Sequence, residues 1–411
     1  MHSVATESHK KQGAKTHNRA SSKKRFISFE KIVIFLAVVA FADLDSYSLW
    51  GISSVMAGLQ LAATLLVVTY AICRNIKLNI FYSLWIILGI WTVIITTILD
   101  ASITQSINFS AKIILPAILF ATFGDDLESI IRSIFAVLSI LAIINFISLL
   151  LFPDGLYVTG ATNQASENWV LGFKNKHIVF FFPLILSTLY LCALDGVKVD
   201  KVIVLLIVGL SIAIAGSGTA IACLAVAFIF VLASFTKGKH SPFNARTYFL
   251  VSLALFVAVV ILRLQDHFSF IIVDVLGKDL TFTNRTSLWD EALRHISEHP
   301  FVGAGYWEAT RKHLLFNSQS IVSAHNYLLE LMFTGGIISL LLFLGINFLL
   351  ASRLRQYNSQ RITRIASAIY FALSLALIVE VYEDFFFFVT FFMIWEAPKV
   401  GQIALSRRSR I

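Results

Sequence analysis

Long apolar runs recur along almost the whole chain and alternate with short polar segments. About 20 apolar residues in a helix cross the hydrocarbon core of a bilayer. Because lipid offers no hydrogen-bond partners to the backbone, such spans must be helices. The runs therefore predict an all-α polytopic membrane protein with about 12 transmembrane helices, within a range of roughly 10 to 13. The predicted spans are residues 32–50, 55–73, 79–99, 109–123, 129–152, 177–194, 202–216, 219–235, 248–264, 325–350, 365–382 and 385–400.

The polar segments predict how the chain is organised. A transmembrane domain at 32–400 lies between two basic tails, 1–31 and 401–411. The first tail has no apolar periodicity, so we expect it to be disordered. Two longer polar segments, 153–176 and 265–324, are expected as loops on the opposite side of the membrane from the tails. Loops of this length usually carry function.

Composition and charge agree with this interpretation. The chain is 57% hydrophobic and only 14% charged, whereas soluble domains carry about 25% charged residues. The net charge of +9 would suit a nucleic-acid partner, but most Lys and Arg lie in the tails and in alternate short loops. That bias predicts cytoplasmic termini, with the tails near anionic membrane lipids and no nucleic-acid partner. The three cysteines lie in or beside predicted spans, so no disulfide is expected.

The longer loop contains a predicted amphipathic helix. Leu288, Trp289, Ala292 and Ile296 follow helical spacing, which places them on one apolar face. Arg285 lies at or just before the N-terminus of this helix. A cation beside unpaired N–H groups favours an anion site. Anchoring of Arg285 to lipid headgroups is an equally good interpretation at this point.

The same helix contains a pattern typical of some zinc proteases. His295, Glu298 and His299 match the H-x-x-E-H arrangement. However, His299 precedes Pro300, which disfavours helical geometry at that position. No third ligand is evident, so no metal site is expected.

Two lysines mark the end of the shorter loop. Lys174, Asn175 and Lys176 precede the sixth predicted span, on the side where basic residues are otherwise scarce. They are candidates for holding a phosphate group. Snorkelling of the lysines to lipid headgroups explains them as well.

Two further polar features lie at span ends. Ser217 lies in the small-residue segment "AGSGTA", which predicts a sharp turn between two spans. Glu380, Glu383 and Asp384 flank the outer end of the eleventh predicted span, next to "FFFF". These acids either bind a sugar acceptor or pair with the lysines, and the sequence does not choose between the two.

Four stretches, taken in order, resemble the O-antigen ligase and polymerase family of bacterial membrane glycosyltransferases. They are "GFKNK", "AGSGTA", "RTSLWDEALRHISEHPFVGAGYW" and "AHNYLLELMFTGGIISLLLF". The last fits the family pattern of His-Asn followed, after nine residues, by Gly, at His325, Asn326 and Gly336. Two positions depart from the family: Gly218 stands where many relatives have Arg, and Ser339 where ligases often have Gly, Thr or Tyr.

The resemblance implies a substrate and a set of site residues. The substrate is a glycan on undecaprenyl diphosphate at the periplasmic face of the bacterial inner membrane, and no cofactor, nucleotide sugar or metal is needed. The implied catalytic residues are His325, which accepts a proton from the acceptor hydroxyl, and Arg285, which stabilises the diphosphate leaving group. The implied substrate-binding residues are Lys174, Asn175, Lys176, Asn326 and Ser217.

Several functions remain open from the sequence. Within the family we expect a polymerase of exopolysaccharide or O-antigen repeat units, because "GFKNK" resembles exopolysaccharide polymerases and Ser339 departs from the ligase pattern. A ligase that moves finished glycan to lipid A core is the alternative, and a protein O-oligosaccharyltransferase is a third. A chain-length regulator and a flippase are expected as further partners. Two alternative functions lie outside this enzyme class: a glycan transporter and a non-catalytic assembly partner.

Overall fold

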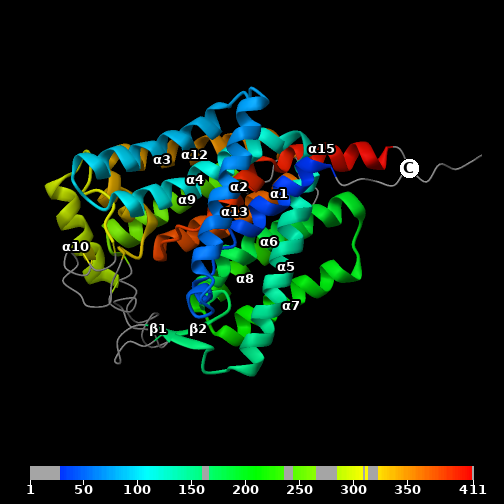
Figure 1. The fold of residues 1–411 in the computed structure, drawn as a ribbon, viewed down its shortest axis with the longest axis horizontal. Helices are drawn as coiled ribbons and strands as arrows, with labels where there is room; N and C mark the ends of the chain where they lie inside the picture. The colour runs from blue at the N-terminus through cyan, green and yellow to red at the C-terminus, as the bar shows by residue number, and fades with distance from the viewer. Residues whose placement is uncertain are drawn as a thin grey trace, which may run out of the picture.

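The protein is mostly helical (Figure 1). A computed structural model describes residues 28–159, 166–235, 244–264, 285–308, 311–312 and 323–409. The helices are α1 (Phe29–Ala40), α2 (Ser53–Cys73), α3 (Ile80–Ile98), α4 (Ile103–Phe123), α5 (Leu127–Leu151), α6 (His177–Asp195), α7 (Val199–Ala215), α8 (Gly218–Ala233), α9 (Ala245–Phe256), α10 (Arg285–Glu298), α12 (Tyr327–Gln356), α13 (Arg361–Val379), α14 (Phe385–Trp395) and α15 (Ala397–Arg408).

The apolar runs fold as helices where the sequence predicts them, with differences at the two ends of the chain. The first predicted span, 32–50, is only partly helical: α1 ends at Ala40, and a short 3₁₀ turn follows at Asp45–Ser48. A helix of 12 residues is about 18 Å long, too short to cross the hydrocarbon core alone. The last predicted span is divided between α14 and α15, because Pro398 near the start of α15 favours a new helix there.

Six helical stretches in the described part of the chain are long and apolar enough to cross a membrane. This fits a polytopic membrane protein, although it does not confirm a count of about 12. Shorter apolar helices accompany them, at Gly218–Ala233, Ala245–Ile261 and Phe385–Trp395. The six stretches are Ser53–Cys73, Ile80–Ile98, Ile103–Leu151, Lys174–Asp195, Tyr327–Gln356 and Arg361–Val379.

Helix α14 forms the centre of the bundle. All 11 of its residues are buried, and its sequence is almost entirely aromatic and aliphatic. A helix that is apolar all round is either enclosed by other elements or surrounded by lipid, and the burial of α14 shows that it is enclosed. Helices α4, α6, α12 and α13 pack around it. By contrast, α2 exposes most of its apolar surface, as expected for a helix at the lipid boundary.

Helix α12 is broken in its middle. Gly336 has φ +66, and together with Gly335 it interrupts the helical geometry. The carbonyl groups freed by the break accept hydrogen bonds from the segment that follows α10: Ala304 N–H donates to the carbonyl of Phe333 over 2.7 Å, and Gly305 N–H to that of Thr334 over 3.0 Å. A break at membrane depth requires such partners, because lipid supplies none.

The molecule has two distinct ends, which we name the α10 end and the α15 end after the helices that mark them (Figure 1). The start of α1 lies at the α15 end, since Glu30 pairs with Arg74 and Arg74 also donates to the carbonyl of Thr122. Lys399 of α15 donates to the neighbouring carbonyl of Gly124 over 2.7 Å. The beginning of α1 and helix α15 therefore share one end of the bundle.

A small antiparallel sheet precedes α6. Its strands are β1 (Tyr157–Thr159), β2 (Ser166–Trp169) and β3 (Gly172–Phe173), in the order β1-β2-β3. Tyr157 pairs with Asn168, and Trp169 pairs with Gly172. The sheet leads the chain directly into the Lys174–Lys176 turn before α6, so it fixes where that turn lies.

Candidate functional site

A buried carboxylate, Glu380, brings together residues from distant parts of the chain. Arg285 Nη2 lies 2.7 Å from Glu380 Oε1, and Asn175 Nδ2 donates to the same oxygen over 2.7 Å. The Arg285 side chain is 16% exposed and that of Glu380 is 8% exposed. With His325 described below, these residues form what we call the Glu380 cluster.

Element ends supply each member of the cluster. Glu380 is the first residue after α13 and has extended backbone. Arg285 is the first residue of α10, and Asn175 lies just before α6. Side chains at helix ends reach outside the packed bundle, so three separate helices deliver polar groups to one point.

Ser217 joins the cluster through Asn175. Its hydroxyl donates to Asn175 Oδ1 over 2.7 Å and also accepts from Ala220 N–H, which caps α8. Gly216, with φ +66, ends α7 immediately before it. The small-residue turn therefore orients Asn175, while the opposite side of the Asn175 amide holds Glu380.

His325 lies at the mouth of α12 in a strained conformation. Its φ of 45 is uncommon for a residue other than glycine. Its Nδ1 is 3.8 Å from Glu380 Oε2, beyond hydrogen-bond distance, and has no hydrogen-bond partner in the described part of the chain. The side chain is nevertheless 35% exposed. Since Nδ1 itself is buried, the exposed part of the ring lies away from Glu380.

Asn326 holds His325 in place. Its side-chain oxygen accepts from Leu329 N–H over 3.0 Å and so caps α12. Its amide group donates to the carbonyl of Ile378 near the end of α13 over 2.7 Å. Asn326 is fully buried. The two helix ends that carry His325 and Glu380 are thus tied together next to the cluster.

The electrostatics of the cluster favour an ionised Glu380. Burial alone would raise the pKa of this carboxyl group, but His325 and the Arg285 guanidinium lower it, and the pKa ends below its usual value. Only Nη2 of Arg285 bonds to Glu380. The other guanidinium N–H groups have no hydrogen bond to a described residue, so they remain available to an anion.

The two lysines before α6 differ in their surroundings. Lys176 Nζ lies 2.9 Å from Asp45 Oδ1 and 3.3 Å from Asp384 Oδ1. Lys174 Nζ lies 5.9 Å from the centre of the Phe173 ring and forms no ion pair with any carboxylate in the described residues. Lys176 therefore ties three segments together, whereas the charge of Lys174 is not neutralised.

The sequence identified the acidic residues after α13 without deciding what they do. The structure answers this separately for each: Asp384 pairs with Lys176, Glu380 with Arg285, and Glu383 accepts a hydrogen bond from Tyr306. Glu380 is the residue whose importance sequence reasoning missed. The signal in the sequence was an acidic residue next to an apolar helix. Burial of a carboxylate without a partner is strongly unfavourable, so such a residue predicts a buried partner.

His295 of α10 lies outside this cluster. His295 contacts Glu291 and Glu298 of its own helix, at 3.4 and 3.3 Å. Within the described ranges, no group of three or more His, Cys, Asp or Glu side chains is arranged to hold a metal ion.

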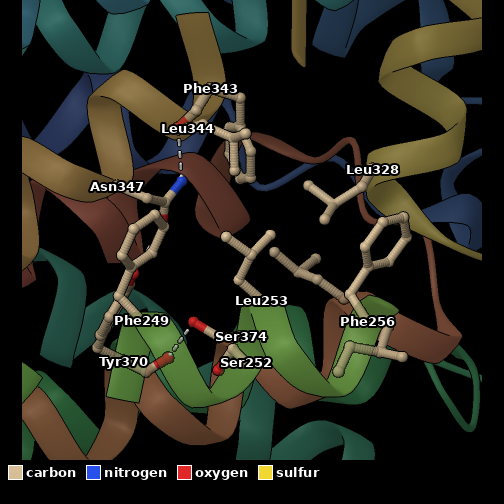
Figure 2. Close-up of a pocket in the computed structure, with 12 residues that line it drawn as sticks. Phe249, Ser252, Leu253, Phe256, Leu328, Phe343, Leu344, Asn347, Tyr370 and Ser374 are labelled. Carbon is tan, nitrogen blue, oxygen red and sulfur yellow. Dashed lines mark hydrogen bonds between the residues drawn. The ribbon is translucent and has the colours of Figure 1, made fainter. Parts of the chain in front are cut away.

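An apolar groove begins beside the cluster and runs between α9, α12 and α13 (Figure 2). Leu328 and Ile378 line its end near the cluster, and Phe249 and Phe256 line its α9 side. Its cavity volume is only about 40 Å³, so it is a narrow groove. The Asn347 amide, bonded to the Phe343 carbonyl over 2.8 Å, is one of its few polar groups.

One family model matches part of the chain. Residues 203–344 match a family model described as O-Antigen ligase. This part of the chain is similar to the O-antigen ligase family. The matched region contains Ser217, Arg285, His325 and Asn326, and it confirms the resemblance drawn from the sequence.

A curated relative points to the same family. The chain is 45% identical, over 62 residues, to a protein of Pseudomonas aeruginosa named "O-antigen ligase". The aligned part is 15% of this chain and 15% of the relative. The similarity therefore covers only a short segment of either protein.

Proposed function

We propose that this protein transfers a glycan from a lipid diphosphate carrier to a sugar acceptor, with the Glu380 cluster as its active site. One observation carries the proposal: Arg285, His325 and Asn175, identified separately from the sequence, meet at one buried carboxylate. The family domain supports a glycan-transferring activity. We further propose that the α10 end faces the periplasm of the bacterial inner membrane.

The cluster suits the charges that develop in such a reaction. The acceptor hydroxyl forms a new bond to the anomeric carbon of the donor sugar. The bond from that carbon to the diphosphate oxygen breaks, and its electron pair leaves with the diphosphate. The free N–H groups of Arg285 and the unneutralised charge of Lys174 stabilise this leaving group.

His325 accepts the proton that the hydroxyl loses. The ring nitrogen remote from Glu380 is the one in the exposed part of the side chain, so it faces the acceptor. Glu380 Oε2 lies 3.8 Å from Nδ1 and so places a carboxylate next to the ring that takes up the proton. Asn326 fixes the turn that carries His325. The polar surroundings of the substrate are completed by Asn175, Lys176 and Ser217.

The apolar groove of Figure 2 is a suitable place for the carrier's hydrocarbon chain. It starts at Leu328 and Ile378, and the carbonyl of Ile378, two residues before Glu380, accepts a hydrogen bond from Asn326. A lipid lying there would have its charged end at Arg285 and its tail among aromatic and aliphatic side chains. The groove can hold only a short part of an undecaprenyl chain, so most of the tail would lie against lipid.

Within this activity we propose a polymerase that joins repeat units of an exopolysaccharide or O-antigen. The Lys174-Asn175 stretch supports it, and so does Ser339, which departs from the usual ligase residues. The test is the length distribution of carrier-linked glycan from a deletion strain. A polymerase defect leaves single repeat units on the carrier. Long carrier-linked chains would instead show that the defect lies in a later step.

A ligase that transfers finished glycan to lipid A core is the second candidate. The names of the matching family model and of the Pseudomonas aeruginosa relative favour it. Accumulation of long carrier-linked chains in the same experiment would select this reaction. A transporter is separated by a different assay: purified protein in liposomes must release undecaprenyl diphosphate from carrier-linked glycan if it is a transferase.

A further inference from the structure

A second polar cluster lies beside the first. Three residues after Glu380, the Glu383 carboxylate accepts a hydrogen bond from the Tyr306 hydroxyl. Lys312 Nζ lies 4.9 Å from the centre of the Tyr306 ring and 2.5 Å from Glu330 Oε1. With Tyr327, these residues form what we call the Tyr306 cluster.

The Tyr306 cluster is held rigidly by the ends of other helices. Tyr306 N–H donates to Thr96 Oγ1 over 3.0 Å, and its carbonyl accepts from Ser102 N–H over 2.9 Å. Its ring stacks on Phe109 with centroids 5.2 Å apart. The phenol that reaches Glu383 is therefore fixed by its backbone and by its ring.

The two clusters differ in charge, because the Glu380 cluster balances one cation, Arg285, against one carboxylate, Glu380. The Tyr306 cluster has one cation, Lys312, and two carboxylates, Glu330 and Glu383. Lys312 is bonded to Glu330, and Lys112 pairs with Asp43 at 3.1 Å. In the described part of the chain, Glu383 thus has no cation as an ion-pair partner. Burial raises the pKa of Glu383, and Glu330 adds to the effect while Lys312 opposes it.

The cluster also has unused hydrogen-bonding capacity. Tyr327 is 1% exposed, yet its hydroxyl has no hydrogen-bond partner among the residues that the structure describes. This hydroxyl lies within electrostatic reach of Glu383 and Glu330. A buried hydroxyl left without a partner is uncommon and calls for an explanation. Tyr306 and Glu383 are only partly buried, so each keeps some surface exposed.

The turn that carries His325 contacts both clusters. Glu330 Oε2 accepts from Ala324 N–H over 2.9 Å, and Glu330 N–H donates to the carbonyl of Asn326 over 2.9 Å. Glu330 therefore braces the turn that carries His325 from one side, while Glu380 faces the imidazole from the other.

We propose that the Tyr306 cluster is the acceptor subsite, which binds the hydroxyl groups of the terminal sugar that attacks the donor. This rests on the proposed function, and it applies equally to a polymerase and a ligase, since a sugar hydroxyl attacks in both. Excess carboxylate repels a diphosphate but accepts hydrogen bonds from neutral hydroxyl groups. Glu383 and Tyr306 bind the sugar, and Glu330 with Lys312 positions the turn.

The test measures acceptor and donor recognition separately. The acceptor probe is oligosaccharide freed from its lipid by mild acid, prepared from carrier-linked glycan and from lipopolysaccharide core. It retains the sugar terminus but lacks the diphosphate. The donor probe is undecaprenyl diphosphate, whose inhibition constant reports on the Glu380 cluster. Glu383→Ala and Tyr306→Phe are expected to raise the KM for the acceptor probe about tenfold. The inhibition constant should stay within about twofold of wild type.

A matched pair controls for general damage. Tyr82 Oη donates to Glu396 over 2.6 Å, far from both clusters, so Tyr82→Phe should leave both constants unchanged. Glu383→Gln, which keeps the shape of the side chain, should retain part of the acceptor binding. Two results overturn the proposal. In the first, the variants weaken the binding of undecaprenyl diphosphate and leave the KM for the acceptor probe unchanged. In the second, wild-type protein extends lipid-bound glycan but extends neither soluble probe. Wild-type protein that releases no undecaprenyl diphosphate would overturn the proposed function itself.

Discussion

Glu380 needs the partners that surround it because its carboxylate is buried. A buried charge without compensation is strongly unfavourable, and removal of one partner from a buried ion pair typically costs about 3–5 kcal/mol. Arg285 and Asn175 supply that compensation. The same contacts hold the free side of the guanidinium in a fixed direction, which is what binding of a leaving group requires.

Arg285 tests this dual role. Arg285→Ala is expected to lower the rate of glycan transfer by on the order of a hundredfold, because a fixed cation at the leaving group is lost. Arg285→Lys should retain part of the rate, since lysine keeps the charge but not the planar fork. Arg294→Ala, on the exposed face of the same helix, is the control and should behave as wild type. Equal rates for Arg285→Ala and Arg294→Ala would remove Arg285 from the site.

The ionisation of Glu380 predicts how stability depends on pH. Because its pKa is lowered in the folded protein, its stabilising contribution is complete above the usual glutamate pKa of about 4.3. The contribution is lost as the pH falls through the lower folded value. Thermal unfolding in detergent should therefore show wild type more stable than Glu380→Gln at neutral pH, with the difference shrinking below about pH 4.3. A difference that stays constant at acidic pH would contradict the ion pair.

For single residues, the sequence predicts which side chains belong to the candidate site better than it predicts their contacts. His325, Arg285 and Asn175 stand in recognisable local patterns, and the structure brings them together. Their common partner could not be identified, because Glu380 is separated by 95 residues from Arg285 and by 205 from Asn175. No local pattern reports a contact over such a distance.

Among the elements, α12 shows why one residue of the His-Asn-Gly pattern must be glycine. Gly336 has a positive φ, and a Cβ added there would lie 2.2 Å from the Phe301 carbonyl carbon and oxygen. The neighbouring segment also bonds across the break, with Ile337 N–H donating to the Pro300 carbonyl over 2.9 Å. The broken helix therefore seats the segment that leads to Tyr306.

Gly336→Ala should consequently be damaging. Both the backbone conformation and the close approach of Phe301 oppose a Cβ, so we expect a loss of about 3 kcal/mol or more in stability. Gly345→Ala in the same helix is the matched control, because a Cβ there meets only Leu84 Cδ1 at 4.0 Å. The measurement is the midpoint of thermal unfolding in detergent. Similar midpoints for the two variants would show that the break is not required.

The apolar runs predict most helices to within a few residues, since length and hydropathy alone define them. They do not predict the break in α12, because the partners of its backbone groups come from residues 300–305. Nor do they predict that α1 ends at Ala40, where the chain turns to bring Asp43 to Lys112 and Asp45 to Lys176. In each case, tertiary contacts override a continuous apolar pattern.

Over the whole molecule, charge separates the two ends. The α15 end gathers arginines that bind carbonyl groups and aromatic rings, such as Arg353 at Trp395 and Arg364 at Ser234. The α10 end carries the two mixed clusters. An excess of Lys and Arg marks the cytoplasmic side of membrane proteins, so we predict that the α15 end faces the cytoplasm.

Single introduced cysteines test this orientation. Ser297→Cys on α10 and Ser406→Cys on α15 both lie at exposed positions. They are introduced after replacement of the natural cysteines Cys73, Cys192 and Cys223. An impermeant maleimide added to intact spheroplasts should label the α10 position and leave the α15 position unlabelled until the membrane is opened. Labelling of the α15 position alone would invert the orientation.

The central claim is that the Glu380 cluster transfers glycan with His325 as the base. The most direct measurement is release of undecaprenyl diphosphate from carrier-linked glycan by purified protein in liposomes, compared among wild type, His325→Ala and His299→Ala. We predict that His325→Ala reduces the rate by about 10²-fold or more, as expected when a general base is lost, while His299→Ala keeps the wild-type rate. A His325→Ala protein that releases carrier at the wild-type rate would contradict the account.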